Sequence, residues 1–532
     1  MKIYIFNAIS VLLIFFTFAS CEKFLEEVPR KELSPANAFK TAQDAELIVI
    51  GCYDPLQAEA ISQGEALFKP NDIMKNIKDI YMPFPDNGYL RDHWKSRYFG
   101  INACNTALDH IPDIEMDNER KNELLSEVLW IRSFLYFGLV REFVNIPMPL
   151  HETTDLANVN IPQVAPDTIY AQIIKDLKFA LQHLGPQSEK AYGRVTKGAA
   201  QALLSKVYLT LGSLEKRDGK GDGKAYFQKC IELSKQIIDS HEYGLVPYFP
   251  DVFHYKNENN EEVIFAVKYT SGGINEGNSI ILRAGIGGGL PSSIGGSWRS
   301  IQATVYFSTI WEESDSIRKD WSVVHVLYNK AKDLLYKTDD TNSYPYCLGK
   351  YRGWPTPENY NKWDEEVDVI IFRYGEVLLN YAEALNEVNN GPNSEVFWAL
   401  NKIRERARYV NGGHTVLLDV FPREYRYVAE NVPDLTPADY PDYQSIFDYL
   451  VLERARELSS ENKRWFDLTR WGLLYERMKW IAYTDDGKAY PATFPEEIGN
   501  YKVCVELSKY PYYAIPVAEI EANPNLIQNT GY

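Results

Sequence analysis

The sequence is poor in the residues that cross-link chains, hold metals or attract anions. Six of its 532 residues are cysteine, eight are histidine, and 56 Lys and Arg face 73 Asp and Glu, for a formal net charge of −17. The cysteines form no CxxC pair, and no two histidines stand at a short metal-ligand spacing. The sequence therefore argues against a disulfide framework, a metal site and a nucleic-acid partner, because phosphate contacts need clustered Lys and Arg.

Sequence motifs of common enzymes are also missing. There is no GxSxG nucleophile elbow, and the loop that begins at Gly285 has Leu290 where a dinucleotide loop needs its third glycine. Residues 218–223 resemble half of a calcium loop, but Lys220 and Lys229 occupy ligand positions, which favours a surface turn. We therefore expect no cofactor and no enzyme activity. A glycosidase carboxylate pair stays open, because the sequence does not reveal the separation of its acids.

Aromatic residues, by contrast, are abundant. They make up 14% of the chain, and tyrosine leads with 37 residues. A tyrosine ring is apolar on its face and polar at its tip, so a chain this rich in tyrosine places some of its rings outside the core.

The N-terminus has the pattern of a secretory signal. Met1-Lys2 precedes an apolar run of about 12 residues, which is too short to span a bilayer that needs ~20 helical residues. A buried first helix is the alternative, but no polar residue interrupts Val11–Phe16. The segment Phe18-Ala19-Ser20-Cys21 resembles a bacterial lipobox, so residues 1–20 are predicted to be a signal peptide and Cys21 to be acylated. Two or more acyl chains would anchor the protein stably.

The remainder, residues 21–532, is predicted to be one mostly α-helical domain. Apolar residues recur at spacings of three and four, and Gly and Pro mark the ends of the expected helices. These helices span 119–145, 166–185, 197–214, 224–240, 374–387, 394–409, 445–460 and 463–476, and a short strand is expected at 262–269. Paired helices with small contact residues resemble tetratricopeptide units.

This domain is predicted to contain two kinds of segment, one helical and one rich in loops. The helical scaffold covers about 93–241 and 366–480, the loop-rich regions cover about 52–92 and 242–365, and a C-terminal tail covers 481–532. A further insertion rich in Pro and Tyr is expected at 410–444. Long loops on a rigid scaffold usually carry function, so the loop-rich half is the expected ligand-binding half.

Six blocks along the chain match one family in order. They are Cys21 with Phe24-Leu25 and Pro29, then WIRSFLYFGLVR at 130–141, RVTKGAAQALLSKVYL at 194–209, FRYGEVLLNYAEALN at 372–386, the ERARELSSENKRWFDLTRWG block at 453–472, and the NPNLIQNTGY ending at 523–532. Together they resemble the motifs of the SusD/RagB lipoproteins. Three departures affect packing or turns, at Val144-Asn145, Ser459-Ser460 and Thr530.

The resemblance implies an outer-membrane lipoprotein that faces the cell exterior. Such a protein covers a SusC-type TonB-dependent transporter, captures a nutrient, usually an oligosaccharide, and delivers it to the channel in polysaccharide utilization. The resemblance also implies a helical scaffold with an irregular ligand-binding half. Two alternatives stay open: a surface glycosidase or other hydrolase, and a transporter lid whose cargo is a peptide or another non-glycan compound.

Loop aromatics are the predicted ligand residues, because sugars stack C–H faces on aromatic rings. In related proteins two loop regions meet over the ligand, and packing or transporter contact is the alternative role for each residue. The predicted residues are Tyr81, Phe84, Asn87 and Tyr89 in the first region, Trp298 and Arg299 in the second with Trp311 and Trp321 downstream, and Trp354.

Other conspicuous residues are predicted to pack. Arg464, Trp465, Asp467 and Trp471 have the look of a catalytic group, but we expect the charges to satisfy buried polar groups and the rings to fill helix contacts. The tryptophans at 94, 130 and 398 are expected in the core, and the five cysteines after Cys21 are expected to be buried free thiols.

Overall fold

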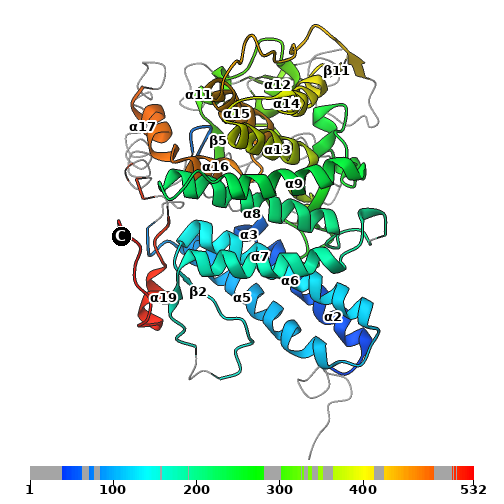
Figure 1. Cartoon of the computed structure of the whole chain (residues 1–532), viewed down its shortest axis with the longest axis vertical. Helices are drawn as coiled ribbons and strands as arrows, with labels where there is room; N and C mark the ends of the chain where they lie inside the picture. Colours follow the sequence, from blue (N-terminus) through cyan, green and yellow to red (C-terminus); the bar gives the residue numbers. More distant parts are fainter. Residues whose placement is uncertain are drawn as a thin grey trace, which may run out of the picture.

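The fold is an array of helices with several small, separate sheets. The computed structural model describes residues 39–62, 71–76, 84–155, 159–189, 191–280, 301–324, 326–328, 334–337, 346–350, 364–411, 425–484, 506, 509–510 and 512–532. In Figure 1 the N-terminal helices form one end, α8 and α9 cross the middle, and helices α11 to α15 form the other end. The mostly α-helical fold class predicted from the sequence is confirmed.

The larger helices pack on one another in chain order. Helix α5 packs on α6, α6 on α7, α7 on α8, α8 on α9 and α9 on α13, and α13 is covered by α14 and α15. Their bounds are Gly88–His110 (α5), Asn118–Phe143 (α6), Pro166–His183 (α7), Lys197–Arg217 (α8), Lys224–Ser240 (α9), Tyr374–Asn389 (α13), Ser394–Ala407 (α14) and Tyr443–Leu458 (α15). Packed neighbours joined by short turns, as α8 and α9 are, form the predicted tetratricopeptide-like helix pairs.

Helix α8 lies at the centre of this array. Thr196 caps it by accepting a hydrogen bond of 3.1 Å from the backbone N–H of Ala199. Nearly every residue from Gly198 to Ser213 is buried, because α7 and α9 cover two of its faces and α13 and α16 contact others. A Cβ at Gly212 would stand 2.8 Å from the ring of Phe227, so glycine is what permits this close approach of α8 and α9.

Seven of the eight predicted helices form with ends within a few residues of the prediction. The prediction of one helix over 463–476 is wrong, because the segment divides into α16 (Arg464–Trp471) and α17 (Leu474–Thr484). Gly472 ends α16 with φ of 73°, a left-handed conformation that glycine adopts without strain. The turn after α6 has no glycine, and Val144 takes φ of 58° there, which is strained for a β-branched residue.

Shorter elements occupy the regions predicted to be loops. The first region contains the end of α2 (Ala42–Tyr53), α3 (Glu59–Ser62), β1 (Met74–Asn76) and the start of α5. The second contains β4 (Val263–Val267), which confirms the predicted strand, together with α11 (Val305–Thr309) and α12 (Ser316–Ser322). The 410–444 insertion holds the hairpin strands β11 (Tyr409–Asn411) and β12 (Tyr425–Tyr427), and α19 (Val517–Ala522) lies in the tail.

The tryptophans divide between core and surface. Trp94 and Trp130 are buried as predicted, but Trp398 is 40% exposed on α14, so its assignment to the core is wrong. The 3.6-residue periodicity of α14 places Val396, Leu400 and Ile403 inward and Trp398 on the opposite face. Trp311 and Trp321, predicted near the ligand loops, are buried, and Trp311 donates its indole N–H to Phe307 O at 2.7 Å.

Cysteine and membrane predictions are tested only in part. Cys52, Cys104 and Cys230 are buried free thiols, as expected. Residues 1–38, including the predicted signal peptide and Cys21, and the side chains of Cys347 and Cys504 lie outside the described residues. Within the described residues, no helix combines the length and apolar character that a membrane crossing requires.

Candidate ligand-binding site

A four-stranded sheet brings the predicted ligand loops to one edge. Its strand order is β1, β5 (Ile301–Ala303), β9 (Cys347–Leu348) and β6 (Val323–Val324), all paired antiparallel. Asn76, the last residue of β1, pairs with Ile301, the first residue of β5. Because Cys347 pairs with Gln302, Leu348 also lies at the edge where Ile301 lies. The chain therefore leaves β1, enters β5 and leaves β9 at the same edge.

Three of the predicted ligand aromatics are attached to this edge. Tyr81 follows Asn76 by five residues, Trp298 precedes Ile301 by three, and Trp354 follows Leu348 by six. Tyr81, Trp298, Arg299 and Trp354 lie outside the described residues. Covalent geometry alone keeps Trp298 within about 11 Å of Ile301 and Tyr81 within about 18 Å of Asn76, at ~3.3–3.6 Å per residue. Adjacent strands are ~4.8 Å apart, so the three segments start close together.

The other predicted ligand residues are described, and they differ in role. Phe84 is 38% exposed and has a ring available to a ligand. Asn87 caps α5, with its side-chain oxygen 2.9 Å from the backbone N–H of Tyr89, so it has a structural task whatever else it contacts. Tyr89 is half-buried and packs against the core. Val517 at the start of α19 donates its backbone N–H to Pro85 O at 2.9 Å, which fixes this turn to the C-terminal tail.

The inner end of the sheet is held by a buried ion pair. Arg464, at the start of α16, donates to both carboxylate oxygens of Asp72 at 2.7 and 2.5 Å. Asp72 precedes β1 by two residues, and its carbonyl accepts a hydrogen bond of 2.7 Å from the hydroxyl of Thr304, which follows β5. The two-pronged contact sets both position and orientation. Arg464 is therefore a structural residue that fixes β1 and β5 to the scaffold.

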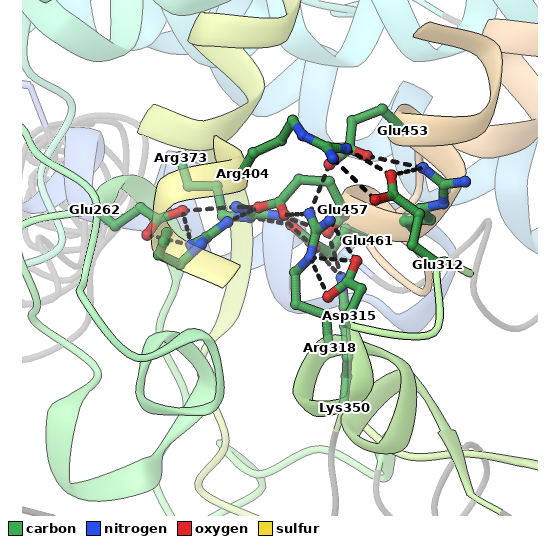
Figure 2. Close-up of polar contacts among 12 residues, drawn as sticks. Glu262, Glu312, Asp315, Arg318, Lys350, Arg373, Arg404, Glu453, Glu457 and Glu461 are labelled. Atoms are coloured by element: carbon green, nitrogen blue, oxygen red, sulfur yellow. Dashed lines mark hydrogen bonds and ion pairs between the residues drawn. The ribbon is translucent and has the colours of Figure 1, made fainter. Parts of the chain in front are cut away.

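Two more residues next to the sheet reach α15 through buried charges (Figure 2). Lys350, two residues after β9, donates to the backbone carbonyl of Glu457 at 2.8 Å and pairs with Glu461. Arg318, on α12 just before β6, contacts Glu453 at 2.6 Å and Glu457 at 3.0 Å. Three of the four strands are thus flanked by a charged side chain that is anchored on α15 or α16.

These contacts belong to a larger set that we call the α15 ion cluster. Six cationic side chains and six carboxylates form ion pairs in this cluster, which lies in the protein interior and reaches its margin. The cations are Arg318, Lys350, Arg373, Arg404, Arg406 and Arg456, and the acids are Glu262, Glu312, Asp315, Glu453, Glu457 and Glu461. Figure 2 shows Glu457 in the middle, with Arg373 on one side and Arg318 on the other.

Charge density in the cluster decides the ionisation of Glu457. Burial raises the pKa of Glu457, but Arg406, Arg373 and Arg318 outweigh burial and hold it well below its usual range. Arg373 lies 2.7 Å from Glu457 and also contacts Glu262 and Glu461, each at 2.6 Å. Glu457 is therefore a fixed anion, which suits it to hold three cations in place and not to exchange protons.

A second buried set surrounds Asp467 on α16. Asp467 accepts from Arg454 at 2.7 Å, from Arg470 at 3.0 Å and from Lys206 of α8 at 3.2 Å. Burial raises the pKa of Asp467, and these cations lower it to well below its usual value. Trp465 is buried, and Trp471 donates its indole N–H to Glu383 at 2.9 Å. The prediction that this group packs and satisfies buried charges is confirmed for Arg464, Trp465 and Asp467.

Among the described residues, no group of three or more His, Cys, Asp and Glu side chains is arranged to hold a metal ion. The 218–223 segment forms the turn between α8 and α9, where Asp218 pairs with Arg217 at 2.7 Å.

Sequence reasoning did not find the residues that hold the sheet. Asp72, Arg318 and Lys350 lie far from their partners in sequence, and charged residues in loop-rich segments read as solvated surface. The sequence did contain one indication that these three residues are structural. Each of them stands within a few residues of a short apolar run that forms a strand or helix.

The architecture defines a class before any relative is considered: a helical-pair scaffold on which a small sheet presents long loops. Two family profiles match the chain, "SusD family" over residues 299–532 and "Starch-binding associating with outer membrane" over residues 24–209. The chain belongs to the SusD/RagB family.

Known relatives agree along almost the whole chain. SusD-like protein P25 of Formosa agariphila is 26% identical over 587 aligned positions, which cover 99% of each chain. A SusD homolog from Bacteroides thetaiotaomicron has the same fold, with a TM-score of 0.73, 22% identity and coverage of 93% of this chain and 98% of that one. A structure described as a laminarin-binding SusD-like protein aligns with a TM-score of 0.68 and 21% identity, over 93% of this chain and 100% of that one.

Proposed function

We propose that this protein is a lipoprotein of the outer cell surface that binds an oligosaccharide and passes it to a SusC-type TonB-dependent transporter. The observation that carries the proposal is the common sheet edge from which the segments bearing Tyr81, Trp298 and Trp354 begin. Family membership supports it, as does the relative that is described as laminarin-binding.

The chemistry of the segments suits a sugar. Three aromatic residues that start from neighbouring strands can offer flat apolar faces to sugar rings, while Arg299 and nearby amides can pair with hydroxyl groups. Phe84 adds an exposed ring in the first region. Ion pairs to α15 and α16 hold β1, β9 and the segment before β6 in place. The strands from which the ligand loops start are therefore rigid, which reduces the entropy that is lost when a ligand binds.

Membrane attachment and transport rest on the N-terminus and the family. The lipobox at Phe18–Cys21 motivates lipid anchoring at Cys21, and one matching profile carries the description "associating with outer membrane". Labelling with radioactive palmitate would test anchoring, and a Cys21→Ser variant should lose both the label and the membrane fraction. Copurification of a TonB-dependent transporter with the tagged protein would test the partnership, and its absence would contradict it.

Sugar binding is tested by calorimetry with a panel of host, plant and algal oligosaccharides, including laminarin fragments. We expect at least one to bind, and Trp298→Ala to weaken that ligand about tenfold or more, as loss of a central aromatic contact does. Trp398→Ala is the matched control, because Trp398 is exposed on α14 and far in sequence from the sheet edge. If peptides bind and no oligosaccharide does, the lid for non-glycan cargo replaces this proposal.

Hydrolysis is the second candidate, favoured by one acid. Burial and the charge of Asp368 raise the pKa of Glu258 to about 8, in the range of a catalytic acid. Asp368, however, already accepts hydrogen bonds from Tyr192 at 2.9 Å and Lys268 at 2.6 Å, and its backbone N–H donates to Glu258 at 2.8 Å, which links β10 (Val369–Arg373) to the chain before β4. Turnover of a bound glycan that Glu258→Gln abolishes would establish the enzyme, whereas an intact bound oligosaccharide after prolonged incubation supports binding alone.

A further inference from the structure

A cavity of about 360 Å³ lies on the helical scaffold, and no described residue of the four-stranded sheet lines it. It forms where the end of α6, the start of α7, the end of α8 and α16 meet the C-terminal segment, on the side of the molecule where Figure 1 places α16 and the C-terminus. The predicted ligand residues that the structure describes, Phe84, Asn87 and Tyr89, do not line it. Its size falls at the low end of the ~300–1,000 Å³ typical of small-molecule sites. We call it the helical cavity.

Tyr170 of α7 is one of the polar groups of the helical cavity that have no hydrogen-bond partner among the described residues. The residue is 4% exposed, its ring packs edge-on to Phe137 at 6.4 Å between centroids, and it lines the helical cavity. Within the described part of the chain, its hydroxyl group makes no hydrogen bond. Burial raises the pKa of Tyr170, so the hydroxyl keeps its proton and can donate it. Because Tyr170 lines the helical cavity, a ligand there can pair with this hydroxyl, which can both donate and accept a hydrogen bond.

Charges of both signs surround this hydroxyl. The Arg141 guanidinium lies 3.8 and 3.7 Å from the ring centroids of Phe137 and Phe466, its Nε donates to Phe137 O at 2.9 Å, and the residue lines the cavity. Asp167 and Glu215 line the same space. Their carboxylates accept no hydrogen bond from the described residues, which leaves two acceptor groups at the cavity.

Mixed charge and aromatic walls select one ligand chemistry. A carboxylate ligand would meet Asp167 and Glu215, and an ammonium ligand would meet Arg141, so neither is strongly favoured. A neutral polyol can donate to the carboxylates and accept from Arg141 and Tyr170, since each hydroxyl does both. The rings of Tyr226, Phe466 and Tyr512 supply apolar faces. These properties match a sugar unit.

We propose that the helical cavity is a second saccharide site, which binds one neutral sugar or a neutral disaccharide through Tyr170, Arg141 and Glu215. The inference extends the proposed function, in that it gives the protein a second point of contact on the helical side of the molecule. Two sites on one chain would raise the avidity for a branched or long polysaccharide, because the second contact becomes intramolecular.

The test uses the full chain with methyl α-D-glucopyranoside, methyl β-D-galactopyranoside and maltose, measured by saturation-transfer NMR and calorimetry. We expect at least one to bind. Tyr170→Phe should weaken that ligand about five- to tenfold, because it removes one hydrogen bond and keeps the ring. Leu211→Trp, which fills the helical cavity from its half-buried wall, should abolish binding. Tyr208→Phe is the matched control, an equally buried tyrosine outside the lining.

Charged sugars and the loop variant separate the possible outcomes. Glucuronate and glucosamine should bind more weakly than the neutral glycosides, and tighter binding of either overturns the neutral class. If no neutral glycoside binds, or if Tyr170→Phe and Leu211→Trp bind like the wild type, the helical cavity is not a saccharide site. If Trp298→Ala loses oligosaccharide binding and the cavity variants bind like the wild type, the loop site is the saccharide site and the helical cavity is not. Tyr170-dependent glycoside binding without any oligosaccharide binding would leave only the cavity.

Discussion

Acidic residues are buried in two regions of this protein, with opposite consequences for their ionisation. In the N-terminal helices, Glu127 pairs with Arg194 at 2.7 Å and Asp176 with Arg132 at 2.7 Å, and burial outweighs these contacts and raises the pKa of both acids. In the α15 ion cluster, burial is opposed by several cations at once, and the pKa of Glu457 falls well below its usual range.

The difference shows how a buried charge becomes useful. One arginine hardly compensates for the loss of water around a carboxylate, so an isolated buried pair adds little stability. Several cations around one carboxylate keep it ionised, and each cation gains a fixed anchor. The N-terminal helices depend mainly on apolar packing, as around α8, whereas the region that carries the sheet depends on fixed charges. Five experiments can break or sharpen this comparison.

Acidification should separate the two regions most strongly. Acids with lowered pKa values, such as Glu457 on α15 and Asp467 on α16, contribute stability that is present above about pH 4.5 and is lost as the pH falls through their lowered folded-state values. Glu127 and Asp176, with raised pKa values, lose nothing on protonation. Hydrogen exchange between pH 5 and 2.5 should therefore show α15 and α16 opening before α6 and α8. Simultaneous opening of all four helices would contradict the comparison.

Removal of the central anion should be the most damaging single change. Glu457→Ala leaves Arg318, Arg373 and Arg406 without a common partner, which costs about 3–5 kcal/mol of the free energy of unfolding. Urea denaturation measures this cost. Glu405→Ala is the control, because Glu405 forms an exposed pair with Lys402 on α14 and should change stability by less than ~0.5 kcal/mol. A loss below about 1 kcal/mol for Glu457→Ala would show that the cluster does not support the fold.

Truncation in the apolar region should have a different signature. Leu203→Ala on α8 creates a cavity in a fully buried site and should cost about 2–4 kcal/mol. Unlike the cost of Glu457→Ala, this loss should be the same at pH 7 and at pH 4, since no charge is involved. Denaturation curves at both pH values provide the measurement. If the free-energy cost of Leu203→Ala changed with pH, the proposed difference between the two regions would be contradicted.

Glu258 provides a case of a half-buried acid inside the loop-rich half. Its folded pKa of about 8 lies above the unfolded value, so its stabilising effect is complete below about pH 4.5 and is lost as the pH rises toward 8. Glu258→Gln should therefore stabilise the protein by about 1–2 kcal/mol at pH 8.5 and leave it unchanged at pH 5. Thermal denaturation at the two pH values measures this. Equal effects at both values would show that Glu258 is ionised throughout.

Trp398 should have the smallest effect on stability. Because the ring is 40% exposed on the outer face of α14, Trp398→Ser should change the free energy of unfolding by less than ~0.5–1 kcal/mol. Trp130→Ser, in contrast, removes a fully buried ring whose indole N–H donates to Ala199 O at 3.0 Å, and should cost at least 3 kcal/mol. A large loss for Trp398→Ser would restore the prediction that this residue belongs to the core.

Prediction from the sequence worked where the information is local. Apolar spacing, with Pro166 at the start of α7, placed α7, α8 and α9 within a few residues. It failed at Trp398, because this residue was assigned to the core as an aromatic although the helical spacing of Val396, Leu400 and Ile403 puts it on the opposite face of α14. The ligand loops were predicted from composition and family, and four of their seven residues lie outside the described residues.

The sequence by itself determined the family, the helical elements and the segments in which ligand residues are expected, because motif spacing and hydrophobic periodicity are properties of neighbouring residues. Only the tertiary structure decided that β1, β5 and β9 share one edge and that Arg464, Lys350 and Arg318 hold this sheet on α15 and α16. It alone also decided that Tyr170 lines a cavity beside Arg141 and Glu215. These partners are separated by tens to hundreds of residues, and the pairing of buried charges is fixed by the packing of the helices that carry them.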